Sequence, residues 1–231
     1  MKQKGFKTFY IALFATIIMV LLFVAGCTKA DDTYRNYKTT AGTYSGNALQ
    51  YLQSQPGVYD SMLLVITRLK GMPELISGGS ITLFAVSNRS FSLALQNINQ
   101  ARKDSLPSMA PVTLSTIDSA TLDEFFGRYI IEGRQSTDSL VGYTDGRLFP
   151  SVRHQYNMQM QLVQTNASGF LEGGPKSIIF SDPKNSVFTR NWVRVNTITV
   201  DIKTENAIVH LLPPGHDFGF GTDFIRLVNK R

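Results

Sequence analysis

The sequence predicts an α+β fold in a single domain, and three observations support this. Helical periodicity dominates the first half of the chain and strand-like patterns dominate the second, without the regular alternation of a doubly wound sheet. There is no internal repeat, so we expect one copy of the fold. About 200 residues follow an N-terminal apolar segment, enough to bury one core. We therefore expect helices of the N-terminal half to pack on a β-sandwich or wedge built largely from the C-terminal half.

Helical patterns occupy four segments before residue 128. Met62, Val65, Ile66 and Leu69 recur at helical spacing, and Gly71 follows them as a stop signal. The expected helices are residues 47–53, 58–70, 88–101 and 119–127. A strand at residues 80–86 and an extended segment at 112–117 are expected between them.

Strand patterns fill the rest of the chain between Gly, Pro, Asn and Asp turns. Met158, Met160 and Leu162 alternate with two glutamines, as in a strand with one exposed face. The expected strands are residues 129–131, 147–149, 156–165, 177–180, 192–200 and 207–212.

Residues 1–26 have the layout of a secretory signal. Three lysines precede an uncharged apolar run at residues 9–25, and small residues lead to Cys27. This layout resembles the lipobox of bacterial lipoproteins, which implies a lipidated Cys27 and a lipid anchor in the outer membrane of the cell envelope. An uncleaved anchor is the alternative, although the run is slightly short for a spanning helix.

The segment at residues 27–45 is polar and reads as a tether. Asp31 and Asp32 resemble the acidic tag of lipoproteins that are sent to the cell surface, while an ordinary solvated linker explains them equally.

Charge and cysteine content exclude several classes of function. Without the three signal lysines, 20 basic residues remain against 17 acidic ones, a net charge of +3. That balance, without a basic stripe, argues against nucleic-acid binding. Cys27 is the only cysteine, so no disulfide, thiol nucleophile or thiolate metal site is expected after lipidation.

Two motifs resemble the signatures of fasciclin (FAS1) domains. Residues 81–91, ITLFAVSNRSF, are similar to the first signature, and residues 200–210, VDIKTENAIVH, to the second. Residues 129–134 followed by 136–140 resemble the central segment of the family. The resemblance covers residues 46–214, and residues 215–231 are expected to pack on this domain as an extension. It implies a non-catalytic module for adhesion or for binding a protein or polysaccharide. The motif positions are Thr82, Phe84, Ser87, Asn88, Phe91, Asn206 and His210.

The residues of these motifs also have a plain physical interpretation. The apolar strand at residues 80–86 is expected at the centre of its sheet, and Ser87 or Asn88 suits the N-cap of the next helix. Phe91 should enter the core, and Asn206 should lie in a turn. We expect His210 to be a core histidine whose ring nitrogens are paired.

Two departures and one carried-over site follow from the resemblance. Tyr129 stands where the family usually has histidine, and Val86 replaces a proline. The positions of Asp201 and Ile202 match a pair implicated in receptor contact in some family members, so they are the expected binding residues. A core position is the alternative for Ile202.

Catalytic and metal-binding patterns are missing from the sequence. It lacks G-x-S-x-G, H-E-x-x-H and phosphate-binding glycine loops. Nothing fixes His210, His216 and Asp217 on one face for a metal. We therefore expect neither an enzyme nor a cofactor. Asp60, Asp104, Asp118 and Asp138 each precede a serine, a pattern that some bacteria O-glycosylate and that helix capping also explains.

Three classes of function compete. The favoured one is a lipid-anchored binding or adhesion module. The second is an accessory subunit of an outer-membrane glycan-uptake or envelope complex, with an outer-membrane protein as partner. Tyr143, Phe149 and Tyr156 would stack on sugars in that case if they were exposed, although strand aromatics usually belong to the core. A hydrolase on an unfamiliar fold is the third and has no nucleophile–base arrangement to support it.

Overall fold

The computed structural model describes residues 42–105, 107–166 and 174–230. The predicted signal, Cys27 and most of the predicted tether lie outside these residues. The part of the chain from Thr39 onward forms one compact unit. Within the described residues, no helix is long and apolar enough to cross a membrane.

Six α-helices and two 3₁₀ turns are described, and five of the helices lie before residue 128. They are α2 (Ala48–Gln53), α3 (Asp60–Arg68), α4 (Met72–Gly78), α5 (Asn88–Ser105), α6 (Ser119–Gly127), α7 (Thr222–Lys230), η1 (Thr137–Leu140) and η2 (Thr189–Asn191). Local capping starts two of them. Asn47 and Gln50 form a capping box at α2, and the Asp118 carboxylate accepts the Thr121 N–H at α6.

Eight strands form two four-stranded sheets. They are β1 (Ile81–Ala85), β2 (Ile130–Glu132), β3 (Arg147–Pro150), β4 (Asn157–Gln164), β5 (Lys176–Asp182), β6 (Val193–Asn196), β7 (Thr199–Lys203) and β8 (Ala207–Leu211). Sheet A has the order β2-β1-β8-β7, and sheet B has the order β3-β4-β5-β6. The α+β prediction is confirmed, and seven of these eight strands follow residue 129.

Strand β1 is central in sheet A, as its apolar sequence predicts. It pairs antiparallel with β2 and parallel with β8, with Thr82 opposite Ile208. All five of its residues are buried because both faces of the strand are covered. The Phe84 ring stacks on the Phe180 ring of β5 with centroids 3.7 Å apart, which joins the two sheets in one core.

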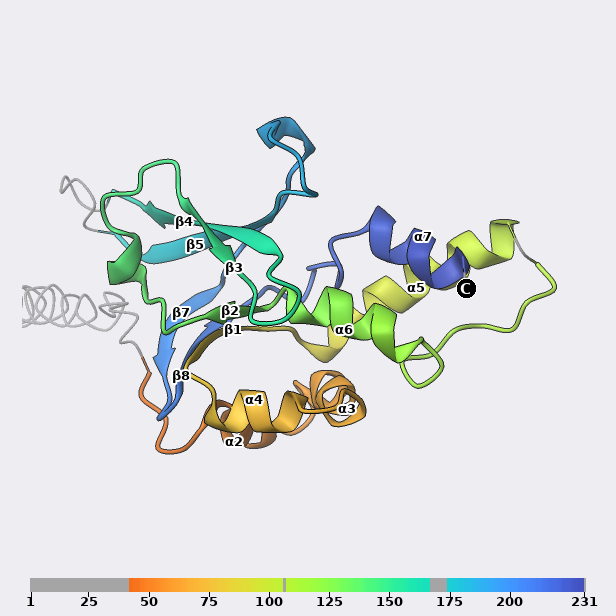
Figure 1. Ribbon diagram of the computed structural model, residues 1–231, viewed down its shortest axis with the longest axis horizontal. Coiled ribbons are helices and arrows are strands. Elements are labelled where there is room, and N and C mark those ends of the chain that lie inside the picture. The colour runs from red at the N-terminus through yellow and green to blue at the C-terminus, as the bar shows by residue number, and fades with distance from the viewer. Residues whose placement is uncertain (1–41, 106, 167–173, 231) are drawn as a thin grey trace, which may run out of the picture. The chain divides into compact units, whose positions relative to one another are not determined.

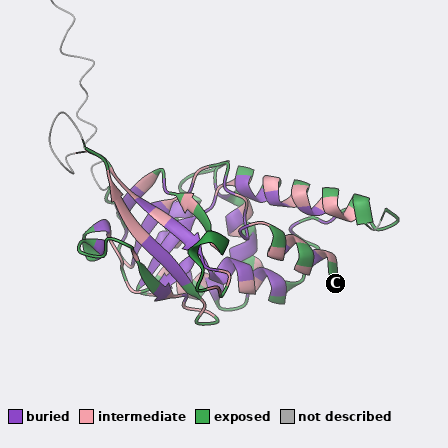
Figure 2. Ribbon diagram, turned by 90° about the horizontal axis from the view of Figure 1, so that it is seen from above, coloured by how far each residue is buried: buried purple, intermediate pink, exposed green. Residues whose placement is uncertain are grey.

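The helices cover sheet A and extend the core beyond the sheets (Figure 1). Helices α2, α3 and α4 lie beneath sheet A, while α5, α6 and α7 gather at one end of both sheets. Buried residues occupy the places where these elements face one another (Figure 2). Helix α7 packs on α5, and its Phe224 and Val228 are buried.

The structure corrects three expectations about the elements. The expected strand at 192–200 is two strands, because the chain leaves sheet B for sheet A there. The Thr197 N–H donates to Ile178 of β5, and the next N–H, of Ile198, donates to Leu211 of β8. The expected extended segment at 112–117 is largely a turn, in which the N–H groups of Thr116 and Ile117 return to a single carbonyl. Helices α4 and α7 lie in segments where the sequence analysis expects none.

Candidate functional site

Most residues of the first motif are buried, and several of them have internal partners. The Thr82 hydroxyl donates to the Gly133 carbonyl and accepts the Gln135 N–H, both at 2.7 Å. Phe91 is buried against Phe218, with ring centroids 4.4 Å apart. Val86, at the position of the family's proline, has an N–H, which points to a methionine sulfur 3.4 Å away.

Asn88 uses its side chain for helix α3 rather than for its own helix. Its Oδ1 accepts the Ser61 N–H at 2.7 Å, and its Nδ2 donates to Gly57 and Asp60. At the start of α5, the Ser87 carbonyl accepts the Ser90 N–H, and the two hydroxyl oxygens lie 3.5 Å apart. The amide of Asn88 therefore fixes the approach of α3 to α5.

Asn206 has a similar bridging role in the turn between β7 and β8. Its Oδ1 accepts the Ala48 N–H at the start of α2, and its Nδ2 donates to the carbonyls of Ile76 and Gly79 at the end of α4. One amide thus satisfies unpaired backbone groups of two helices and holds both against sheet A.

His210 and Asp201 form one buried polar network. The His210 Nδ1 accepts the Asp201 N–H at 3.2 Å, and Nε2 lies 3.0 Å from the Gln135 carbonyl. The Asp201 carboxylate accepts both the N–H and the hydroxyl of Thr137. Burial lowers the pKa of His210 to about 4, so the ring is neutral at pH 7 and donates through Nε2.

The two expected binding residues present little surface. Asp201 is 9% exposed and Ile202 is 8% exposed, and the Asp201 backbone has a φ of +61° in a β-bulge of β7. The Asp201 carboxylate is already bound to Thr137. A receptor-binding role for this pair therefore stays a prediction, and a surface for partners has to be sought elsewhere.

The chain after residue 214 packs into a second buried polar network. The Tyr129 hydroxyl lies 2.7 Å from the His216 Nε2 and accepts the Gly219 N–H at 2.9 Å. Phe218 and Phe220 stack against the Tyr129 ring, each at an interplanar angle of 18°. Burial lowers the pKa of His216 to about 3, so its ring is neutral at pH 7. The rings of five residues contact one another, and we call this group the aromatic cluster: Tyr129, His216, Phe218, Phe220 and Phe224.

In contrast to the buried aromatic cluster, the loop between β5 and β6 projects from the surface. We call residues 183–192 the β5–β6 arm; it rises from sheet B on the side away from α2, α3 and α4 (Figure 1). Its turn begins where the Asp182 carboxylate accepts the Lys184 N–H at 2.8 Å. Lys184 and Asn185 then adopt left-handed φ values of +54° and +53°, which reverse the chain.

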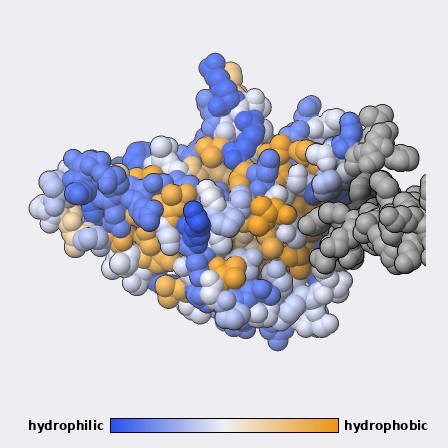
Figure 3. All heavy atoms as spheres, turned by 180° about the vertical axis from the view of Figure 1, so that it is seen from behind, coloured by the Kyte–Doolittle hydropathy of each residue, from blue (hydrophilic) through white to orange (hydrophobic). Residues whose placement is uncertain are grey.

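Apolar side chains are exposed at the tip of the arm. Val187 is 85% exposed and Phe188 is 60% exposed. Figure 3 shows the arm standing clear of the surface, with a pale orange group beside hydrophilic residues at its end. Val193 and Ile198, after the arm, are also exposed. Exposed apolar groups gathered on a projection are typical of an interaction surface.

Internal hydrogen bonds hold the arm in one conformation. The Trp192 indole N–H donates to the Ser186 carbonyl at 2.8 Å, and the Ser186 hydroxyl accepts from the Phe188 N–H and the Asn191 amide. The Arg194 guanidinium donates to the Thr189 carbonyl. A surface that is already ordered loses less conformational entropy on binding.

The arm and the strand that follows it carry positive charge only. Residues 183–200 contain Lys184, Arg190 and Arg194 and no acidic residue. Lys184 is paired with Asp223, whereas neither arginine is in a salt bridge among the described residues. Arg190 lies over the Phe188 ring and Arg194 over the Trp192 ring, which presents aromatic and guanidinium groups together. Such groups are enriched at protein interfaces.

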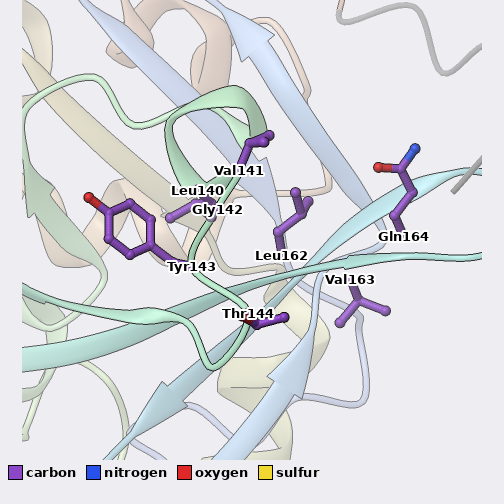
Figure 4. Close-up of a pocket in the computed structure, with 8 residues that line it drawn as sticks. All are labelled: Leu140, Val141, Gly142, Tyr143, Thr144, Leu162, Val163 and Gln164. Atoms are coloured by element: carbon purple, nitrogen blue, oxygen red, sulfur yellow. The ribbon is translucent and has the colours of Figure 1, made fainter.

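A shallow pocket of 460 Å³ lies at the opposite end of sheet B (Figure 4). It is formed by the segment after η1 and by the last residues of β4, including Leu162 and Gln164. The Tyr143 ring turns away from Leu162 in this view. Of the three aromatics considered for sugar stacking, Tyr143 is exposed, Phe149 is buried, and Tyr156 donates its hydroxyl to Asp182. The pocket offers no set of converging polar side chains.

The described residues also offer little for catalysis or metal binding. They contain no group of three or more His, Cys, Asp and Glu side chains that could hold a metal. His154 is exposed and its Nε2 lies 3.0 Å from the Asp123 carboxylate, but no hydroxyl contacts the ring among their hydrogen bonds. The arm is the surface that the sequence analysis missed, since it treats residues 192–200 as one strand. Val187 and Phe188 between turn-forming residues were the available signal.

Comparison with known proteins gives a likeness to a solved structure. No family model matches the chain, and none of the curated proteins matches it. Among solved structures, the chain is similar to a FAS1 domain pair from the insect cell adhesion molecule Fasciclin I, with a TM-score of 0.47 and 11% sequence identity. The match covers 78% of this chain and 52% of that structure, so the chain spans about half of its length. A likeness at this level does not establish membership of a family.

Proposed function

We propose that this protein is a non-catalytic, extracytoplasmic binding module of the fasciclin type, and that the β5–β6 arm carries the contact with its partner. The single observation that supports the arm is its ordered, exposed tip of Val187 and Phe188 beside two arginines that have no acidic partner within the described part of the chain. The two motifs at residues 81–91 and 200–210 support the fasciclin assignment.

The proposal includes a lipid anchor at Cys27 in the outer membrane of the cell envelope. The layout of residues 1–27 supports it. Mass spectrometry of the mature N-terminus tests this part: a diacylated Cys27 is expected, and an intact Met1 would contradict it.

The nature of the partner separates two versions of the function. An adhesion or binding module would hold a protein or polysaccharide ligand, while an accessory subunit of a glycan-uptake or envelope complex would hold one outer-membrane protein in a fixed ratio. The arm favours a protein as the partner in either version, because the exposed Val187 and Phe188 would fit an apolar pocket on the surface of another protein.

Binding of the full-length protein to the cell envelope of its source organism tests the proposal. We expect Val187→Ser combined with Phe188→Ser to weaken retention at least tenfold, because the contact loses its apolar anchors. Leu64→Ser combined with Leu148→Ser is the matched control, since these residues are also exposed but lie on α3 and β3.

Each outcome of this experiment has a clear meaning. Normal retention by the arm variant, with the fold intact by circular dichroism, would contradict the arm as the contact. Equal losses of retention in both double variants would show that exposed apolar side chains bind the envelope nonspecifically. A single stoichiometric partner recovered after cross-linking would select the accessory-subunit version.

A further inference from the structure

The two sheets differ in how their edge strands are covered. In sheet A, residues 42–44 lie along β7: the Tyr44 N–H donates to Lys203, and the Lys203 N–H donates to Gly42, both at 2.8 Å. The other edge, β2, is covered where the Val152 N–H donates to Ile130 at 2.9 Å. Both edges of sheet A are therefore occupied by the protein's own backbone.

In sheet B, no described segment covers the β6 edge. At its β3 edge, Pro150 lacks an N–H, and the chain continues at once into the bridge between Ser151 and Ile131 of β2. At its β6 edge, residues Val193–Asn196 pair with β5 on one side only, and no other backbone segment bonds to them among the described residues. A bare edge is a template for another strand.

The ladder shows which groups of β6 face this open edge. The Thr197 N–H donates to Ile178 of β5, so alternate residues before it, Val195 and Val193, also point to β5. The backbone groups of Arg194 and Asn196 then point away from the sheet. An added strand would find donors and acceptors two residues apart, as antiparallel pairing requires.

Charge identifies the kind of strand that this edge accepts. Arg194 is in β6 and Arg190 comes three residues before β6 begins, and there is no acidic residue from 183 to 200. Pairing β6 with a second copy of itself would bring two Arg194 side chains to opposite or neighbouring positions, which is unfavourable. An acidic strand from another protein would instead face both guanidinium groups.

We infer that β6 is a docking edge, at which a partner protein adds an extended, acidic segment as a fifth strand of sheet B. This inference rests on the proposed function, because the segment would lie against the arm that holds the partner. Side chains of the added strand alternate between two faces, so apolar residues would lie beside Val193 and Val195, and carboxylates beside Arg194.

A short synthetic peptide serves as the probe. We expect an acetylated and amidated peptide of four Val-Glu repeats to bind the full-length protein in detergent and to shift the amide NMR signals of Arg194 and Asn196. A peptide of four Val-Lys repeats is the matched control and should not bind. Raising the salt concentration should weaken the binding of the acidic peptide, because its contacts with the arginines are exposed to solvent.

A proline variant tests the backbone contact itself. Asn196→Pro removes an N–H that faces outward without removing a bond to β5, so we expect peptide binding to fall at least tenfold. Asn196→Ala keeps this N–H. Its affinity for the peptide should therefore stay within about twofold of that of the parent, because no backbone hydrogen bond is lost. Thermal unfolding shows whether both variants are folded.

Three results would overturn the inference. They are equal binding of both peptides, equal binding of the two Asn196 variants, and a dimer of the free protein that Asn196→Pro abolishes. The proposed function is tested separately: if Val187→Ser with Phe188→Ser loses the envelope and Asn196→Pro does not, the arm binds a partner without strand addition. If both variants retain the envelope, the proposed function fails as well.

Discussion

The aromatic cluster around Tyr129 and the β5–β6 arm use similar residues for opposite purposes. Both combine aromatic rings with turn-forming residues and include residues of left-handed φ. In the cluster, Phe218 is fully buried and the Tyr129 hydroxyl is paired on two sides. In the arm, Phe188 is exposed and the arginines beside it have no acidic partner among the described residues.

The difference comes from what each segment can reach. The chain after residue 214 runs from sheet A toward helices α5 and α6, and α7 packs on both of these helices. The arm leaves sheet B between two adjacent strands. Hydrogen bonds within the arm satisfy Ser186 and the Trp192 indole, while Lys184 at its base pairs with Asp223 of α7. The cluster therefore contributes to stability, whereas the arm contributes an ordered surface at little cost to the fold.

The largest expected effect is on the free energy of unfolding, which should respond very differently to a substitution in the cluster and to one in the arm. Phe218→Ala should lower the free energy of unfolding by about 4 kcal/mol, because it leaves a cavity against Tyr129, Phe91 and Phe224. Phe188→Ala should change it by less than about 0.5 kcal/mol, because that ring is exposed. Urea unfolding followed by circular dichroism measures both. Equal losses would mean that the arm belongs to the core.

A smaller effect depends on pH, and the cluster contributes to it through His216 while His210 contributes in the same direction from outside the cluster. Burial lowers the pKa of His216 to about 3, so below pH 6.5 the unfolded chain binds a proton that the folded chain does not. The contribution of His216 is thus fully present above pH 6.5 and should fall by about 2 kcal/mol between pH 7 and pH 5.

The variant His216→Gln tests this contribution, because its side chain does not titrate. We expect the stability of this variant to fall less steeply than that of the parent between pH 7 and pH 5. His154→Gln is the control, since His154 is exposed and lies outside the cluster. If His216→Gln and the parent have the same pH dependence, His216 is not buried as a neutral ring.

The smallest effect concerns the order within the arm. Trp192→Phe removes the indole N–H that donates to Ser186 and should cost about 1 kcal/mol or less of global stability. It should nevertheless speed hydrogen exchange at the amides of residues 186–191, while exchange in the cluster stays unchanged. Uniform changes in exchange would contradict an arm that is ordered by its own contacts.

Much of the fold was predictable because it depends on local patterns. The apolar sequence of residues 81–85 predicted a buried central strand, and the spacing of Met62, Val65 and Ile66 predicted α3. Helix α7 was not predicted even though Phe224 and Val228 have helical spacing, because the glycines just before it are typical of turns rather than of a helix. Residues 192–200 have one continuous strand pattern, and nothing local marks the change of sheet at Thr197.

The sequence by itself determined the α+β class, the apolar strand at the centre of sheet A and the lack of catalytic and metal-ligand motifs, because periodicity and residue type act locally. The tertiary structure decided which polar residues are internal. Asn88 and Asn206 serve helices that are distant in sequence, and Asp201 is bound to Thr137. It also decided that Val187 and Phe188 face solvent, because exposure depends on which segments pack together.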